Sequence, residues 1–179
     1  KQAQNIPADG WYRVDGIPFS TPPSLHYYAA LYLKFEQGEA LHAVIAFRGT
    51  VMKAANLFVD LTSWCSDVMG DGSHAVTPPL YYSFSLSFTQ ACMNYLKNSP
   101  FSYLASPGRY TYAGHSLGGA LAQLMATASP YPAKAIAFNS PGCGNISVVN
   151  NNLCPNVTNI NARFGLINKA GKPTGPVTY

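Results

Sequence analysis

Residues 110–122 of the chain read YTYAGHSLGGALA, and this stretch decides the fold. The short run from Arg109 to Ala113 is typical of a buried strand, and Gly119 to Ala128 is rich in strong helix formers. Between them lies the pattern Gly-x-Ser-x-Gly, with Ser116 at its centre. In this context the pattern predicts a nucleophile elbow, a strand-to-helix turn so sharp that the serine adopts strained backbone angles.

The elbow gives each of its residues an expected role. Side chains at Gly114 and Gly118 would collide with neighbouring backbone, so both positions require glycine. The turn is expected to raise the Ser116 hydroxyl out of the sheet, over a helix N-terminus whose free N–H groups favour negative charge. The Leu117 N–H is then one oxyanion donor. His115 is adjacent in sequence, but its side chain should point away, so we interpret it as a packing residue rather than the catalytic base.

Working outward from the elbow, strands and helices alternate along the chain. We expect strands over 27–36, 41–47, 109–113, 133–139 and 157–164, and helices over 54–69, 83–97 and 119–128. A turn at 37–39 joins the first two strands into a hairpin, and a further strand is expected at 179. This order predicts one α/β-hydrolase domain over 27–179, with a mostly parallel central sheet and helices on both faces, after an irregular segment at 1–26.

The composition restricts the classes of function. Charged residues make up 10% of the chain, against roughly 25% in an average soluble domain. This suits a secreted or extracytoplasmic protein that works near lipid, and an ordinary domain with an uncharged polar surface fits equally well. The eleven Lys and Arg residues form no basic block, so no nucleic-acid binding is expected, although the net charge of +4 allows peripheral contact with anionic membranes. The sequence contains no run of 18 apolar residues, so we expect no transmembrane helix.

The four cysteines do not have the spacing of a zinc site, and no ligand cluster indicates a metal or a cofactor. Cys143 and Cys154 bracket a loop rich in Gly and Asn, where a disulfide bond is sterically feasible. Four free thiols, which include Cys65 and Cys92, are the alternative. Because the sequence shows no ligand cluster, we expect no cofactor.

Three segments resemble the class 3 lipase family, which includes fungal triacylglycerol lipases and bacterial phospholipase-like proteins. They occur in the family's order and spacing and read AVIAFRGT (43–50), GHSLGGALA (114–122) and AIAFNSPG (135–142). The resemblance covers roughly residues 27–170. It implies an α/β-hydrolase fold and a serine esterase that acts on lipid or ester substrates, as a lipase or a phospholipase A-like enzyme.

The resemblance also assigns roles to residues. It implies that Ser116 is the nucleophile, and that the N–H groups of Thr50 and Leu117 bind the oxyanion. A threonine that merely ends its strand is the alternative at position 50. Arg48 and Asp60 match family positions that we interpret as structural, with the two side chains paired.

The rest of a catalytic triad departs from the family pattern. In α/β-hydrolases an acid and a histidine follow the serine, but no Asp, Glu or His follows Ser116 here, and Gly165 stands where the family has its acid. One explanation is that the chain is C-terminally incomplete. A second is that His74, with Asp71 nearby, supplies the base. A third is a catalytically inactive protein that uses the fold to bind lipid or a partner.

Other assignments also remain open. Among the earlier histidines, His42 lies at the wrong end of its strand and His26 precedes the first strand. Residues 51–58 and 75–82 flank the expected mouth of the site, as a lid and acyl-chain surface or as ordinary core helix and loop. Our leading hypothesis is a serine carboxylic ester hydrolase, and a protease or acyltransferase on the same fold is a further rival.

Overall fold

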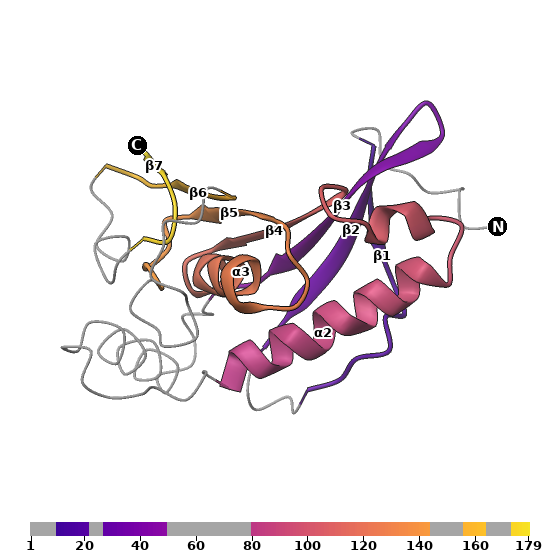
Figure 1. Ribbon diagram of the computed structural model, residues 1–179, viewed down its shortest axis with the longest axis horizontal. Helices are drawn as coiled ribbons and strands as arrows, with labels where there is room; N and C mark the ends of the chain where they lie inside the picture. Colours follow the sequence, from indigo (N-terminus) through magenta and orange to yellow (C-terminus); the bar gives the residue numbers. More distant parts are fainter. Residues whose placement is uncertain (1–9, 22–26, 50–79, 144–155, 164–172) are drawn as a thin grey trace.

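A computed structural model describes residues 10–21, 27–49, 80–143, 156–163 and 173–179 (Figure 1). The described strands form one seven-stranded sheet in the order in which they occur along the chain. They are β1 (Trp11–Val14), β2 (Ala29–Glu36), β3 (Glu39–Phe47), β4 (Tyr110–His115), β5 (Lys134–Phe138), β6 (Val157–Ile160) and β7 (Val177–Thr178). The described helices are α2 (Leu80–Lys97), α3 (Leu117–Ala128) and the short 3-10 helix η3 (Ser102–Ala105).

The sheet changes from antiparallel to parallel at β3. Strands β1, β2 and β3 pair antiparallel, whereas β3 to β7 pair parallel. The change follows from the connections, since β2 and β3 are joined by a tight turn in which Gln37 and Gly38 have φ angles of 51° and 85°. Turns with two positive φ angles match the twist of a hairpin. The predicted hairpin and the mostly parallel sheet are both confirmed.

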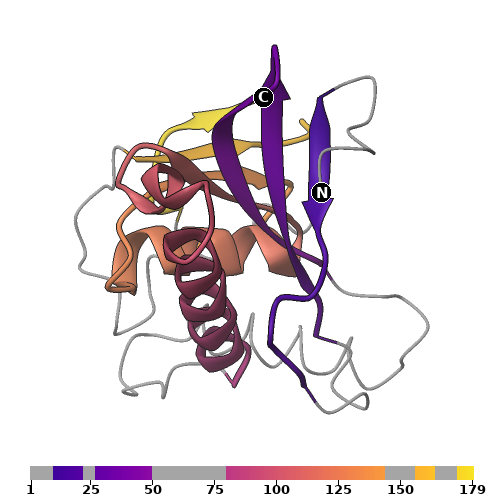
Figure 2. The same ribbon diagram turned by 90° about the vertical axis from the view of Figure 1, so that its right-hand side faces the viewer.

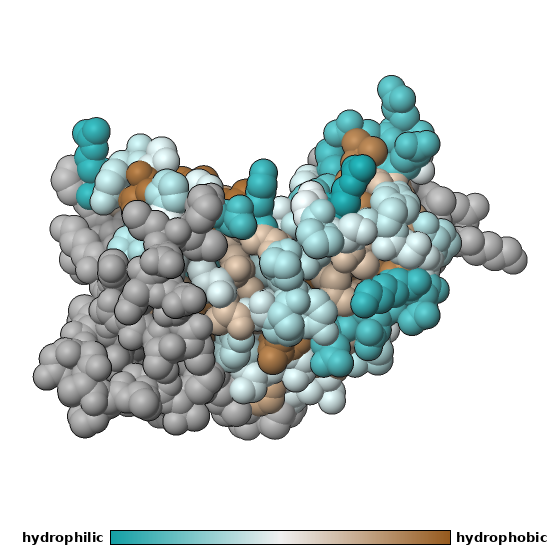
Figure 3. Space-filling model, viewed as in Figure 1, coloured by the Kyte–Doolittle hydropathy of each residue, from teal (hydrophilic) through white to brown (hydrophobic). Residues whose placement is uncertain are grey.

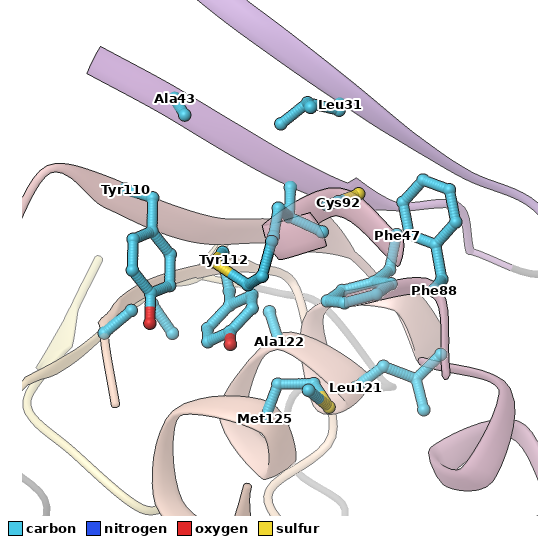
Figure 4. Close-up of a cluster of buried hydrophobic side chains, with 14 of the residues drawn as sticks. Leu31, Ala43, Phe47, Phe88, Cys92, Tyr110, Tyr112, Leu121, Ala122 and Met125 are labelled. Atoms are coloured by element: carbon cyan, nitrogen blue, oxygen red, sulfur yellow. The ribbon is translucent and has the colours of Figure 1, made fainter. Parts of the chain in front are cut away.

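One apolar core holds the two long helices against a single face of the sheet. Strands β3 and β4 alternate, so that Ile45 and Tyr112 are buried on the helix side while their neighbours Val44 and Ala113 face the other way. Figures 1 and 2 show α2 beside α3 beneath this face. Figure 4 shows side chains of both helices and both strands packed together, including Phe88, Tyr112 and Leu121.

Helix α3 lies at the centre of this packing. Nine consecutive residues, from Leu117 to Met125, are buried, because the sheet covers one side of the helix and α2 packs against another. Such a helix must be apolar on nearly all sides, which explains its sequence of Leu, Ala, Gly and Met. The predicted α/β-hydrolase fold is confirmed, although neither described long helix lies on the second face of the sheet.

The structure corrects several predicted boundaries. The irregular segment expected at 1–26 is wrong for Trp11–Val14, which pair with β2 as strand β1; aromatic and branched residues favour a strand even between Gly10 and Gly16. Helix α2 begins three residues earlier than expected, at Leu80, and η3 lies between α2 and β4, where we expected no helix or strand. Strand β6 ends at Ile160, four residues early. The helix predicted at 54–69 lies outside the described residues.

Candidate active site at the strand-to-helix elbow

Ser116 joins β4 to α3 with backbone angles that L-residues rarely adopt. Its φ is 55° and its ψ is −127°, a conformation that costs a non-glycine residue on the order of 1–3 kcal/mol. Hydrogen bonds hold it there: the Ser116 N–H donates to the Phe138 carbonyl at 2.9 Å, and the Ser116 carbonyl accepts from the N–H groups of Gly119 and Ala120. The predicted sharp turn is therefore present, with its strain located on the serine.

Glycines allow three backbone segments to meet at the elbow. A Cβ atom at Gly114 would lie 2.2 Å from the carbonyl carbon of Gly118, and one at Gly118 would lie 2.1 Å from the carbonyl oxygen of Phe47. A Cβ atom at Gly49 would lie 2.5 Å from the His115 carbonyl oxygen. These contacts are tighter than any side chain tolerates, so the end of β3 lies directly against the turn.

The backbone around the hydroxyl suits an anionic oxygen. The N–H groups of Leu117 and Gly118, at the start of α3, have no hydrogen-bond partner among the described residues. Neither does Ser116 Oγ within the same part of the chain. A helix N-terminus with unpaired N–H groups attracts negative charge, so this arrangement can stabilise an oxyanion beside the serine.

The exposure of the serine differs from the expectation. We expected the elbow to raise the Ser116 hydroxyl clear of the sheet, but the residue is only 6% exposed. The reason is the close approach of the β3 end, where a Cβ atom on Gly49 would lie 3.3 Å from Ser116 Cβ. A substrate must therefore gain access to a nearly buried hydroxyl.

The second predicted oxyanion donor, Thr50, lies outside the described residues, as do Asp60, Asp71, His74 and Gly165. Gly49, the residue before Thr50, is described, and its close approach to Ser116 brings the chain to the elbow. Arg48, two residues before Thr50, has its guanidinium 5.0 Å from the centre of the Tyr28 ring. It also donates its backbone N–H to the Tyr28 carbonyl at 3.0 Å, which agrees with a structural role for this arginine.

The two described histidines are poorly placed to act as the base for Ser116. His115 is exposed, so the packing role that we expected for it is wrong. His42 lies five residues before the end of β3, about 16 Å along the strand. The described carboxylates, Asp15, Glu36 and Glu39, belong to the β1–β3 region.

A buried glutamine that the sequence analysis did not single out ties together the segments around the elbow helix. Gln123 of α3 is fully buried, and its Nε2 donates to Ser140 Oγ at 2.9 Å and to the Pro141 carbonyl at 3.0 Å. Its Oε1 accepts from Thr174 Oγ1 at 3.0 Å and lies 3.9 Å from Cys143 Sγ. The only available signal was the one polar side chain within the apolar run from Leu117 to Met125.

The sequence analysis also missed two asparagines that directly follow strands β5 and β6. Asn139 follows β5 with a φ of 43°, and its Oδ1 accepts a hydrogen bond from the Ala162 N–H. Asn161 follows β6 and is 6% exposed, and its Oδ1 has no hydrogen-bond partner in the described structure. Asparagine tolerates the left-handed conformation better than most residues, which suits Asn139 to the end of a strand.

The described residues provide neither a metal site nor a membrane-spanning helix. These contain no group of three or more His, Cys, Asp or Glu side chains able to hold a metal ion. No described helix is long and apolar enough to span a membrane.

A strained serine between a parallel strand and a buried helix, on a mostly parallel sheet, defines the α/β-hydrolase class of folds. Residues 44–160 match the family described as lipase (class 3). The match spans well over half of the chain, which therefore belongs to the class 3 lipase family.

The fold is similar to that of a solved lipase structure. The extracellular lipase LipA from Serratia marcescens is 18% identical, with a TM-score of 0.59, over 94% of this chain and 29% of that one. The M37 lipase is 19% identical, with a TM-score of 0.46, over 86% of this chain and 53% of that one. The chain thus spans less than a third of the Serratia lipase. No curated protein matches the sequence.

Proposed function

We propose that this protein is a serine carboxylic ester hydrolase that acts on lipids, through an acyl-enzyme on Ser116. The observation that carries the proposal is the backbone of Ser116, with φ of 55° and ψ of −127° at the start of a buried helix. A fold does not retain a strain of this size without compensation, and such outliers cluster at functional sites. Membership of the class 3 lipase family supports lipid esters as the substrate class.

In the proposed reaction, Ser116 Oγ attacks the ester carbonyl carbon and loses its proton to a base. Negative charge develops on the carbonyl oxygen, which the Leu117 N–H and the predicted Thr50 N–H bind. The carbon–oxygen bond to the alcohol then breaks, and the alcohol leaves with a proton. Water attacks the acyl-enzyme in the same way and releases the fatty acid.

The base is the part of this scheme that the described residues do not supply. His42 is excluded by its distance from the elbow and the exposed His115 directly precedes the serine in sequence, so within this chain His74 is our candidate, with Asp71 nearby as its acid. A phospholipase A-like preference and an extracytoplasmic location are further expectations. The first follows from the family resemblance and the second from the low charge.

A fluorophosphonate probe tests the proposal, because it reacts covalently only with an activated serine. We expect labelling of the protein, in buffer or with a lipid emulsion, that Ser116→Ala abolishes. Ser106→Ala is the matched control, since Ser106 is exposed and remote from the elbow in the fold, and it should label normally. His74→Ala should slow labelling by orders of magnitude if His74 is the base.

The principal alternative is a catalytically inactive member of the fold that binds lipid or a partner. Folded wild-type protein that resists the probe under every condition, while still binding lipid emulsions, would establish that alternative. Cleavage of peptides with no turnover of nitrophenyl esters would instead favour the protease rival.

A further inference from the structure

The second face of the sheet carries an uncovered apolar surface. Because Ala135 and Ala137 of β5 are buried against the helix side, Ile136 and Phe138 face the opposite side. Phe138 is in register with Ile160 of β6, and each of these two side chains is 40% exposed. Parallel sheets normally have both faces covered, so the exposed apolar side chains on this face suit contact with a further apolar group.

Cations stand at one end of this surface. Lys134 begins β5 on the same face as Ile136 and Phe138, and it is in register with Thr111 of β4. The Thr111 hydroxyl is 2.8 Å from His42 Nε2. Arg109 immediately precedes β4. Burial is the main cause that lowers the His42 pKa, and the charges of Arg109 and Lys134 lower it further. The three basic groups therefore lie together at the amino-terminal edge of the strands.

The part of the sequence that supplies Arg109 and Lys134 carries no acidic residue. From residue 72 to residue 179 the chain has six Lys and Arg residues and no Asp or Glu. The described ion pair, between Arg13 and Asp15, lies instead beside β1. Figure 3 shows hydrophobic surface over β5 and β6 at the upper edge of the molecule, with hydrophilic residues beside it.

We infer that the outer face of β4, β5 and β6 binds an anionic amphiphile with a single acyl chain, such as a fatty acid anion. Its head group lies among Arg109, Lys134 and His42, and its chain runs along Ile136 to Phe138 and Ile160. From Lys134 to Phe138 the strand spans about 13 Å, so one ligand of modest length can satisfy both ends. Cations at one end and apolar side chains at the other match the polarity of such a molecule.

The same observations disfavour a second copy of this chain as the occupant. A symmetric pairing centred on Arg109 and Lys134 would bring two cationic clusters together, and like charges in contact are repulsive. The proposed surface is on the opposite side of the sheet from α3. It is therefore separate from the proposed chemistry at Ser116 and does not depend on it.

Binding of decanoate to the Ser116→Ala protein tests the inference without any turnover. Calorimetry below the micelle concentration should show one site, and amide shifts in the nuclear magnetic resonance spectrum should map to β4–β6. Each of Lys134→Gln and Arg109→Gln should weaken binding about two- to fivefold, as expected for an exposed charge pair. The control Lys97→Gln, which removes an exposed cation on α2, should leave it unchanged.

The apolar half of the surface has its own test. Ile160→Ser should weaken decanoate binding while sparing the fold, because this side chain lies outside the buried core and is 40% exposed. Decyltrimethylammonium, which has a similar chain and the opposite charge, should bind at least tenfold more weakly. Equal binding of both amphiphiles, shifts confined to the elbow, or a dimer that buries Phe138 and Ile160 would each overturn the inference.

Discussion

A methyl group at position 114 is the sharpest test of the elbow as the structure presents it. In Gly114→Ala the new Cβ would lie 2.2 Å from both the carbonyl carbon and the carbonyl oxygen of Gly118, and 2.7 Å from the Gly119 nitrogen. All three atoms are backbone of the first helical turn, so no side-chain rotation relieves the collision. Either the turn opens or the helix shifts away from β4.

The expected cost follows from the nature of the collision. Overpacking a core costs typically 1–3 kcal/mol, and a backbone collision belongs at the upper end, at about 3 kcal/mol. For a domain of this size that corresponds to a fall in Tm of about 6–12 °C. Because misplacement of a reacting group by about 1 Å can cost a factor of about 100, labelling of Ser116 should fall much more than stability does.

Urea denaturation and the rate of fluorophosphonate labelling measure the two effects separately. Gly108→Ala is the control, because Gly108 has a φ of 83° and open space around it. That change should cost about 1–2 kcal/mol from backbone strain alone and leave the labelling rate unchanged. If Gly114→Ala unfolded within 0.5 kcal/mol of wild type (roughly the effect of a neutral surface change) and labelled normally, our account of the elbow would be refuted.

Three further predictions follow from the same structure. Ser116→Gly should raise the unfolding free energy by about 1–2 kcal/mol in urea titrations, since glycine adopts the strained angles freely; Ser116→Ala should not. Gln123→Met should cost roughly 2–4 kcal/mol, because it leaves the buried Thr174 hydroxyl without its partner and removes the donor to Ser140 Oγ and to the Pro141 carbonyl, and a loss below 1 kcal/mol would contradict the network. Burial, and then the neighbouring cations, hold the His42 pKa below its ordinary value. The contribution of His42 to the free energy of unfolding should therefore be complete above its ordinary pKa, and it should decline as the pH falls toward its pKa in the folded protein. Resonance titration and denaturation at several pH values would detect this decline. His42→Gln should remove the pH dependence.

The sequence predicted those parts of the fold that depend on local pattern. The alternation around Tyr112 and the Gly-x-Ser-x-Gly turn were sufficient to place β4, α3 and the serine between them. Strand β1 was missed because its four residues carry too little periodicity, and only pairing with β2 stabilises them.

The candidate site was predicted less completely than the fold. The near burial of Ser116 depends on how closely Gly49 approaches from another strand, and no local pattern encodes that distance. The Gln123 network was missed for a similar reason, since its partner Thr174 is 51 positions away along the chain. Long-range contacts of this kind become visible only when the strands are assembled.

The order of the described strands, from β1 to β7 without exception, has a consequence for biosynthesis. No later strand has to be inserted between two that are already paired, so each new strand can add to an open edge as it leaves the ribosome. We therefore expect the hairpin of β2 and β3 to serve as the template for β4, with Ser116 acquiring its strained geometry only after β5 has docked and its Phe138 carbonyl is in place.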